Sequence, residues 1–164
     1  MNKNENVEIE KKFLVKDIPF DLNEFKSAYI RQAYISIDPV IRLRQKDDDY
    51  IFTFKGRGQV KRTEFEDKLS KTQFLKLWEK IEGVAIEKTR YFIPFLADFG
   101  DYKKECVAEL DIYGGELSGF KSVEVEFDSE NDANNFKPPA WFGEDVSLES
   151  KYKNSSMSIF GLNL

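Results

Sequence analysis

The sequence predicts a mainly β fold of the α+β kind, a closed antiparallel barrel of eight strands with a polar interior, covered by a few helices. Aromatic content is the first reason: 15 Phe and 7 Tyr stand against only 9 Gly and 5 Pro, and aromatic side chains suit a pleated, half-buried surface. The second reason is an alternation of polar and apolar residues with a period of two. With 41% hydrophobic residues in 164, we expect one domain, residues 1–164, with a substantial core.

Short turns separate the predicted strands. The strands cover residues 7–15, 28–37, 40–46, 49–56, 61–69, 85–94, 103–113 and 122–127. The turns fall at residues 38–39, 47–49, 56–58 and 114–115, where Asp, Pro and Gly gather. Helices are predicted over residues 71–81, behind Ser70 as N-cap, and over residues 21–27 and 130–135. We expect the aromatic segment beyond Pro139 to pack over the barrel.

Composition excludes several classes of function. The 30 acidic and 25 basic residues give a net charge of −5, which argues against a nucleic-acid binder that relies on excess Lys and Arg. The chain has no histidine, so catalysis by Ser-His or Cys-His pairs and zinc sites built on imidazole are excluded. Any catalysis must therefore use carboxylates, Lys, Arg, Tyr or a metal bound by oxygen ligands.

The single cysteine and the charged first residues predict a cytoplasmic protein. No segment has the length and apolar character of a membrane span, so we expect no membrane partner. Cys106 shares its strand face with Ala108, Leu110 and Ile112, which predicts a buried and inert thiol. A homodimer is compatible with the composition.

Charged residues on the predicted strands are grouped by sign. Residues two apart on a strand share a face. The same-sign pairs are Glu8 with Glu10, Arg42 with Arg44, Glu64 with Glu66, Lys88 with Arg90, Glu109 with Asp111, and Glu124 with Glu126. A solvated sheet face explains any one pair, but like charges at adjacent positions repel, and a merely soluble surface favours mixed signs. The repetition therefore indicates a ligand that compensates both signs.

The two kinds of pair suggest two kinds of binding. Acidic pairs can hold Mg²⁺, Mn²⁺ or Ca²⁺ through carboxylate oxygens. Basic pairs can bind phosphate oxygens, and Arg does so through two parallel hydrogen bonds. A small polyanion bridged to a metal satisfies both sets, and a barrel of about eight strands can hold one small extended ligand.

The segment Glu8-Ile9-Glu10-Lys11-Lys12 resembles the N-terminal Glu-x-Glu-x-Lys signature of the CYTH superfamily, the triphosphate tunnel metalloenzymes. Further motifs follow in the order of that family: Ile41-Arg42-Leu43-Arg44, Thr53-Phe54-Lys55-Gly56, Glu64-Phe65-Glu66, Lys88-Thr89-Arg90-Tyr91, Glu109-Leu110-Asp111 and Val123-Glu124-Val125-Glu126-Phe127. With a tyrosine at position 34, the sequence resembles the small bacterial inorganic triphosphatases most closely.

This resemblance implies a role for each motif residue. One or two divalent cations, Mg²⁺ or Mn²⁺, would be bound by Glu8, Glu10, Glu124 and Glu126, with Glu64, Glu66, Glu109 and Asp111 as further candidates. The substrate, a small polyanion with three phosphates, would be bound by Lys12, Arg42, Arg44, Lys55 and Arg90. Lys88 would join this second set unless it pairs with a carboxylate.

The resemblance also implies hydrolysis of inorganic triphosphate to pyrophosphate and phosphate. Glu126 or a second cation would orient the attacking water. Lys12 and Tyr34 could form a proton-transfer pair, although Tyr34 fits equally well as a hydrogen-bonded barrel filler. The alternatives are thiamine triphosphate or nucleoside triphosphate hydrolysis, adenylate cyclase activity, and a non-catalytic polyphosphate-binding module. The surplus of acidic pairs favours a metal enzyme, and the missing histidine argues against a cyclase.

Overall fold

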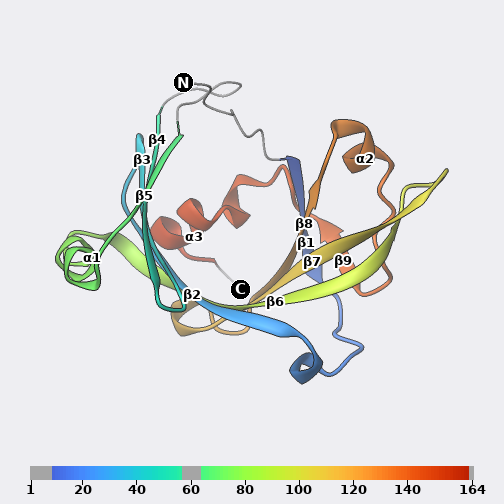
Figure 1. Ribbon diagram of the computed structural model, residues 1–164, viewed down its shortest axis with the longest axis horizontal. Coiled ribbons are helices and arrows are strands. Elements are labelled where there is room, and N and C mark those ends of the chain that lie inside the picture. The colour runs from blue at the N-terminus through green and yellow to red at the C-terminus, as the bar shows by residue number, and fades with distance from the viewer. Residues whose placement is uncertain (1–8, 57–63, 163–164) are drawn as a thin grey trace. The chain divides into compact units, whose positions relative to one another are not determined.

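The protein forms one nine-stranded sheet in the computed structural model, which describes residues 9–56 and 64–162 (Figure 1). The strands are β1 Ile9–Val15, β2 Lys26–Ile37, β3 Val40–Lys46, β4 Asp49–Lys55, β5 Glu64–Lys68, β6 Glu82–Asp98, β7 Lys103–Tyr113, β8 Lys121–Phe127 and β9 Phe142–Asp145. Their order in the sheet is β5-β4-β3-β2-β6-β7-β8-β1-β9. The β1–β8, β1–β9, β2–β3, β3–β4 and β4–β5 pairings are antiparallel.

The strand order confirms the predicted mainly β, antiparallel fold. All eight predicted strands form, with ends shifted by up to four residues within the described ranges. The predicted strand parts at residues 7–8 and 61–63 and the predicted turn at residues 57–58 lie outside the described residues. The ends of the order are β5 and β9, so hydrogen bonds do not close the sheet into a barrel within the described residues. The sequence pattern does not predict β9, which has only four residues and pairs with β1. A strand of that length is too short for a recognisable alternation.

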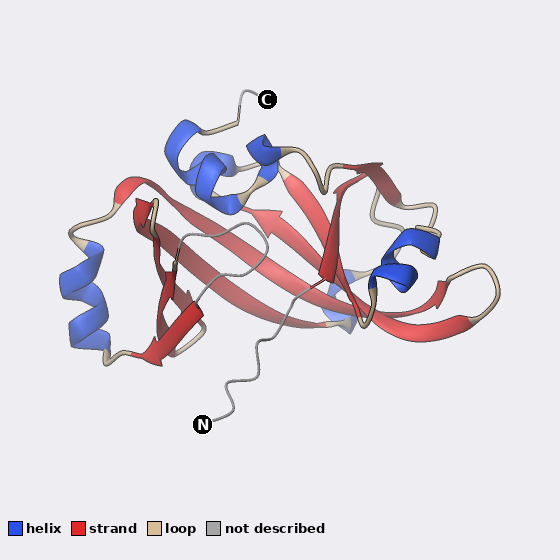
Figure 2. Cartoon of the chain, turned by 90° about the horizontal axis from the view of Figure 1, so that it is seen from above, coloured by secondary structure: helices blue, strands red, loops and turns tan. Residues whose placement is uncertain are grey.

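Three α-helices accompany the sheet: α1 Lys71–Trp78, α2 Glu130–Asn135 and α3 Asn154–Phe160 (Figure 2). Three short 3-10 turns, η1 Leu22–Glu24, η2 Gly115–Leu117 and η3 Ser150–Tyr152, complete the described elements. Helix α2 matches its prediction, whereas α3 lies in the tail, for which the sequence predicts packing but no helix. Within the described ranges, no helix combines the length and apolar character needed to cross a membrane.

Two predicted helices differ from the structure. Helix α1 starts behind Ser70 as predicted, with a reciprocal capping box to Gln73, but it ends at Trp78, where tighter turns carry the chain toward β6. The prediction of a helix over residues 21–27 is wrong. Asp21 caps only the short turn η1, and β2 begins at Lys26 because the strand alternation already starts there, with Ala28 and Ile30 buried.

The chain divides into two compact units. The first unit contains residues 1–26, 91–111 and 121–148, and the second contains residues 27–90, 112–120 and 149–164. The prediction of a single domain stays a prediction.

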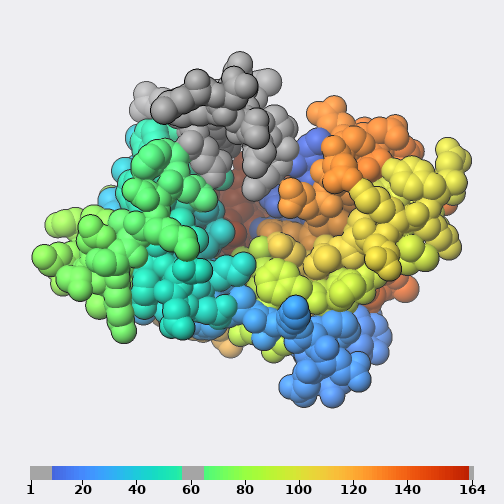
Figure 3. Space-filling model, in the orientation of Figure 1, coloured from blue at the N-terminus to red at the C-terminus, as the bar shows by residue number. Residues whose placement is uncertain are grey.

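Aromatic rings form the core of the first unit. The ring of Phe136, just beyond α2, has its centroid 5.1 to 6.2 Å from those of Phe13, Phe95, Phe99, Phe127 and Phe142. Tilted and edge-to-face contacts of this kind add to the free energy gained by burying the rings. The start of β7 lies beside α2 (Figure 3), joined to it by a hydrogen bond from Tyr102 to Asp132. This packing fixes β1 and β8 side by side.

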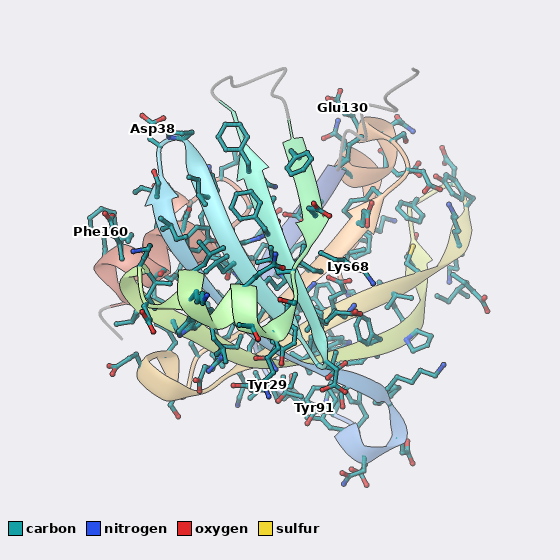
Figure 4. All side chains as sticks on the ribbon, turned by 60° about the vertical axis from the view of Figure 1, so that its left-hand side comes forward. Tyr29, Asp38, Lys68, Tyr91, Glu130 and Phe160 are labelled. Atoms are coloured by element: carbon teal, nitrogen blue, oxygen red, sulfur yellow. The ribbon has the colours of Figure 1, made fainter. Side chains whose placement is uncertain are left out.

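The second unit has α1 packed against the β3–β4 hairpin. Phe74 of α1 is fully buried, 4.9 Å from the Tyr50 ring of β4 and 5.0 Å from Trp78. The Arg31 guanidinium lies 4.4 Å from the centre of the Trp78 ring. Figure 4 looks onto this side of the hairpin, with Asp38 at the β2–β3 turn and Lys68 at the end of β5. The apolar side of β3 and β4 is therefore the covered side, and their polar side chains point the other way.

Helix α3 belongs to the same unit and lies against the start of β6. The Ser158 hydroxyl donates to the Val84 carbonyl at 2.6 Å. Gly83 has a φ of +67°, and a Cβ at this position would lie 2.2 Å from the Ser158 carbonyl oxygen. Only glycine allows this close approach.

Candidate functional site

The polar side of β2 to β5 carries two rows of side chains in the second unit. In one row, Tyr34 lies opposite Arg42, Arg42 opposite Thr53, and Thr53 opposite Glu66. In the other row, Gln32 of β2 lies opposite Arg44 of β3. We call these six residues, together with Arg90, the basic cluster. Residues two apart on β3 share a face, so the register brings together the predicted pair Arg42 and Arg44.

Arg42 is held by two acceptors on the neighbouring strands. Its terminal nitrogen donates to the Thr53 hydroxyl at 3.2 Å and to the Glu66 carboxylate at 3.3 Å. The Thr53 hydroxyl in turn donates to the same Glu66 oxygen at 2.8 Å. The Nε atom of Arg42 is buried and has no hydrogen-bond partner within the described part of the chain. An anion could supply the missing acceptor.

Arg44 is held by a neutral acceptor. Its Nε donates to the side-chain oxygen of Gln32 at 2.9 Å, and Gln32 is fully buried. Burial, followed by the nearby charges of Arg42 and Arg90, lowers the pKa of Arg44 from 12.5 to about 10. Three guanidinium groups near one another give this part of the unit a positive character.

The other predicted phosphate-binding residues of this unit lie on the same strands or on β6. Lys55 ends β4, two residues beyond Thr53 on the same face, and Glu64 lies opposite it on β5. Lys88 of β6 is 2% exposed, and its Nζ lies 5.3 Å from the centre of the Tyr113 ring. Tyr34 is 4% exposed, and its hydroxyl accepts from the Gln32 amide at 3.5 Å.

Paired carboxylates face each other on β1 and β8 in the first unit. Glu10 lies opposite Glu126, and Lys12 lies opposite Glu124. Intervening residues such as Phe13 and Val125 point to the other side and are buried. We call Glu10, Lys12, Glu124 and Glu126 the acidic cluster. Like charges directly opposite each other destabilise a strand pair, and a cation placed between Glu10 and Glu126 would relieve that repulsion.

Lys12 supplies a positive charge to this cluster. Its Nζ lies 2.9 Å from the Glu124 carboxylate, and the two side chains are only 13% and 10% exposed. The Lys12 backbone N–H donates to the Ser147 hydroxyl at 3.0 Å, which fixes β1 from its other edge. Lys12 and Glu124 therefore compensate each other within the unit, and Glu10 and Glu126 bring two carboxylates to adjacent strands. The predicted pairing of Lys12 with Tyr34, a residue of the second unit, stays a prediction.

The remaining predicted metal ligands are distributed as follows. Glu109 and Asp111 share one face of β7, and Asp111 is fully buried. Glu8 lies outside the described residues. Glu66 accepts from Arg42 and Thr53 in the second unit. Among the residues that the structure describes, no three Cys, Asp or Glu side chains form a ready metal-binding group, so the ligand set stays a prediction.

Cys106 is only partly buried, against the prediction of a buried thiol, because it lies in the first half of β7, which is largely exposed. Desolvation nevertheless raises the pKa of its thiol, which agrees with low reactivity. It lines a cavity of about 220 Å³ in the first unit, together with Phe99, Glu126 and Asp128.

Two residues of the basic cluster are absent from the sequence-based assignment, Gln32 and Thr53. Both are fully buried polar residues that hydrogen-bond a predicted phosphate-binding arginine. Each shares a strand face with a predicted site residue, Gln32 with Tyr34 and Thr53 with Lys55. This shared strand face was the available signal in the sequence. Neither residue is charged, so the grouping of charges by sign does not select them.

Comparisons with known proteins cover nearly the whole chain. The inorganic triphosphatase of Nitrosomonas europaea is 40% identical over 155 residues, covering 93% of this chain and 97% of that protein. The inorganic triphosphatase of Acetivibrio thermocellus is 31% identical over 154 residues, covering 92% of each. No family model matches the sequence.

A solved structure agrees with these relatives. The crystal structure of the inorganic triphosphatase NE1496 matches with a TM-score of 0.72 and 38% identity, over 94% of this chain and 95% of that chain. Identity at this level over nearly the full length confirms the predicted resemblance to the CYTH superfamily. The chain belongs to the family of inorganic triphosphatases.

Proposed function

We propose that the chain hydrolyses inorganic triphosphate to pyrophosphate and phosphate, using a divalent cation bound by the acidic cluster and basic residues that bind the phosphates. Membership of a family whose relatives are named inorganic triphosphatases supports the reaction. The chemistry of the two clusters supports the division of labour, because carboxylate oxygens suit hard cations and guanidinium groups suit phosphates.

One observation carries the proposal more than any other: the partly buried arginines of the basic cluster. Arg44 has its pKa lowered to about 10 by burial and by Arg42 and Arg90. Arg42 keeps a buried Nε without an acceptor in the described residues. Gathering like charges away from water raises the free energy of the folded protein, and a bound polyanion reverses that cost.

The acidic cluster fits a hard divalent cation. Glu10 and Glu126 lie opposite each other on β1 and β8, and their oxygen atoms match the preference of Mg²⁺ and Mn²⁺. A cation bound there would withdraw negative charge from the phosphate oxygens and make the phosphorus easier to attack. We assign one or two such ions to this cluster, with Glu8, Glu109 and Asp111 as further ligands.

The side chains then divide the work of phosphoryl transfer. Arg42, Arg44 and Arg90 stabilise the charge that spreads over the transferred phosphoryl oxygens, with Lys55 and Lys88 as further phosphate-binding groups. Glu126 accepts a hydrogen bond from the attacking water and orients it. Tyr34 and Lys12 provide groups that can move a proton. Catalysis of this kind relies on positioning and electrostatics, and no covalent intermediate with the chain is needed.

A phosphate-release panel tests the proposed substrate. Purified protein is incubated with inorganic triphosphate, pyrophosphate, ATP or thiamine triphosphate, each with Mg²⁺, Mn²⁺ or Ca²⁺. We expect each molecule of inorganic triphosphate to release one phosphate and one pyrophosphate in a metal-dependent reaction. The kcat/KM for each of the other three substrates should be at least tenfold lower. A higher kcat/KM for ATP or thiamine triphosphate would replace the proposed substrate. Tight triphosphate binding without any phosphate release would overturn the enzymatic proposal.

The metal assignment is tested separately with Glu10→Gln. This variant keeps the size of the side chain and removes its charge, so we expect loss of metal-dependent turnover with the fold retained. Glu144→Gln is the matched control, because Glu144 is an exposed carboxylate of β9 in the same unit. Full Mg²⁺-dependent activity in Glu10→Gln would contradict the assignment.

A further inference from the structure

The two central arginines of the basic cluster are held by acceptors of different charge. Arg42 donates to a carboxylate, Glu66, at 3.3 Å. Arg44 donates instead to the amide oxygen of Gln32 at 2.9 Å. A carboxylate compensates part of a guanidinium charge, whereas an amide orients the group and leaves its charge in place. Arg44 is therefore held in position with its positive charge nearly intact.

Gln32 is built into the strand pair in a way that suits this task. It lies directly opposite Arg44 across β2 and β3, and it is fully buried. Burying an amide is unfavourable unless its polar atoms find partners. Its oxygen accepts from Arg44, and its nitrogen donates to the Tyr34 hydroxyl at 3.5 Å. Gln32 thus links two predicted site residues through one neutral side chain.

We propose that Gln32 is a positioning residue that orients Arg44 without compensating its charge, and so reserves that charge for the triphosphate. The inference rests on the proposed function of the basic cluster. Neutral support costs stability in the free protein, because Arg44 stays charged although it is largely removed from water and lies near Arg42 and Arg90. The lowered pKa of Arg44 has the same causes, burial first. The same charge is then available in full when a phosphate oxygen arrives.

Glu66 provides the contrast within the same cluster. Its carboxylate is about half exposed, with 49% of the side chain accessible, so water weakens its pairing with Arg42. Arg42 therefore starts partly compensated, and a phosphate must compete with Glu66 for it. Arg44 has no such competitor among its hydrogen-bond acceptors in the described residues.

The test replaces Gln32 by Glu and by Met. Gln32→Glu keeps the acceptor and adds a negative charge beside Arg44, so we expect KM for triphosphate to rise by about tenfold or more. KM should also depend less steeply on salt, because the cluster loses one net positive charge. Gln32→Met keeps the side-chain volume and the charge of Arg44 but loses the hydrogen bond, so we expect a smaller rise of about threefold.

Gln73→Glu is the matched control for charge. Gln73 is exposed on α1 in the same unit, and glutamate preserves its capping box with Ser70. This variant changes the net charge equally and should leave KM unchanged. The thermal midpoint of each variant separates the charge effect from misfolding: we expect it to be unchanged or higher in Gln32→Glu, because Arg44 then has a counter-charge.

NMR of Arg44 and assays of the wild-type protein complete the test. The ¹³Cζ and ¹⁵Nε NMR signals of Arg44 should show its pKa rising in Gln32→Glu. A wild-type KM in Gln32→Glu, or an equal rise in Gln32→Glu and Gln32→Met, would overturn the inference, because charge would then have no separate role. Wild-type protein that neither binds nor hydrolyses triphosphate would instead refute the proposed function, and assays of the wild type alone detect that outcome.

Discussion

The acidic cluster of the first unit and the basic cluster of the second unit differ in the partners of their poorly exposed charged side chains. Lys12 and Glu124 lie 2.9 Å apart with little exposure, so each compensates the other within its own unit. Arg44 is held by a neutral amide and lies near two further arginines. In the first arrangement, removal of either partner would leave an uncompensated buried charge, whereas the second raises the free energy of the folded chain until an anion binds.

This difference shows that burial of a charged residue does not by itself identify a functional site. Lys12, Glu124 and Arg44 are all largely buried. What distinguishes Arg44 is the absence of a compensating carboxylate among its hydrogen-bond acceptors in the described residues. The charge of the nearest partner is therefore a better guide to ligand binding than the exposed fraction.

The largest effect is expected from Arg44→Met, which removes the uncompensated charge. We expect kcat/KM for triphosphate to fall by about 100-fold or more, while the free energy of unfolding stays equal or rises by about 1 kcal/mol. Steady-state kinetics and urea unfolding measure the two quantities. A large loss of stability with little loss of activity would reverse the contrast between the clusters.

Glu124→Gln probes the compensated pair. Removing the carboxylate charge opposite Lys12 should lower the free energy of unfolding by about 2 kcal/mol. The double variant Lys12→Met with Glu124→Gln should recover at least half of that loss, since no buried ammonium group then remains. A double-mutant cycle from urea unfolding gives the coupling. Additive losses would mean that the pair contributes nothing as a pair.

High pH should weaken phosphate binding through Arg44. Its pKa is about 10 in the folded chain against an ordinary 12.5, so triphosphate affinity should fall by up to about tenfold per pH unit above that value. The contribution of Arg44 to the free energy of unfolding changes in the opposite direction. Between the two values the unfolded chain binds more protons, so this group favours folding more as pH rises. Calorimetry without metal measures the triphosphate affinity, and an NMR titration of Arg44 measures its pKa. A triphosphate affinity that stays constant up to pH 11 would contradict a role for Arg44 in phosphate binding.

The smallest effect concerns the carboxylates of β1 and β8. Without metal, Glu126→Gln relieves the repulsion with Glu10 and should raise the free energy of unfolding by about 0.5 kcal/mol. With Mg²⁺ or Mn²⁺ added, the wild type should gain more thermal stability than the variant. Thermal unfolding with and without metal measures this. Equal metal-induced shifts would place the cation elsewhere.

The sequence predicts much of the strand arrangement and the family. A period of two determines which residues share a face, so the sequence alone pairs Arg42 with Arg44 and Glu124 with Glu126. The β3–β4 register confirms the first pair, with Arg42 opposite Thr53 and Arg44 opposite Ile51. The sign of the charges is enough to anticipate a site for a polyanion and a metal, and the family motifs indicate a triphosphatase, which the relatives support.

Contacts between strands could not be predicted in the same way. Gln32 meets Arg44 only because of the β2–β3 register, which shifts at an irregularity between Tyr34 and Ser36. Glu66 is a metal candidate by sign alone, and its hydrogen bonds to Arg42 and Thr53 depend on how β4 and β5 align. The odd or even position of a residue determines which face of the sheet it occupies, whereas the register between two strands determines which residue lies opposite it.

The loop between β3 and β4 has a consequence for how the site can be lost. Lys46 lies opposite Asp49, so only Asp47 and Asp48 form the loop. Asp47 has a φ of 50° and accepts from the Tyr29 N–H at 3.0 Å, which ties the loop to β2. Because β2 also holds β3 in register, one inserted residue that shifted the hairpin would turn Thr53 and Lys55 of β4 to the apolar side and leave the arginines of β3 in place. The length of this loop therefore determines which side of the sheet Thr53 and Lys55 face, although neither loop residue is a proposed ligand.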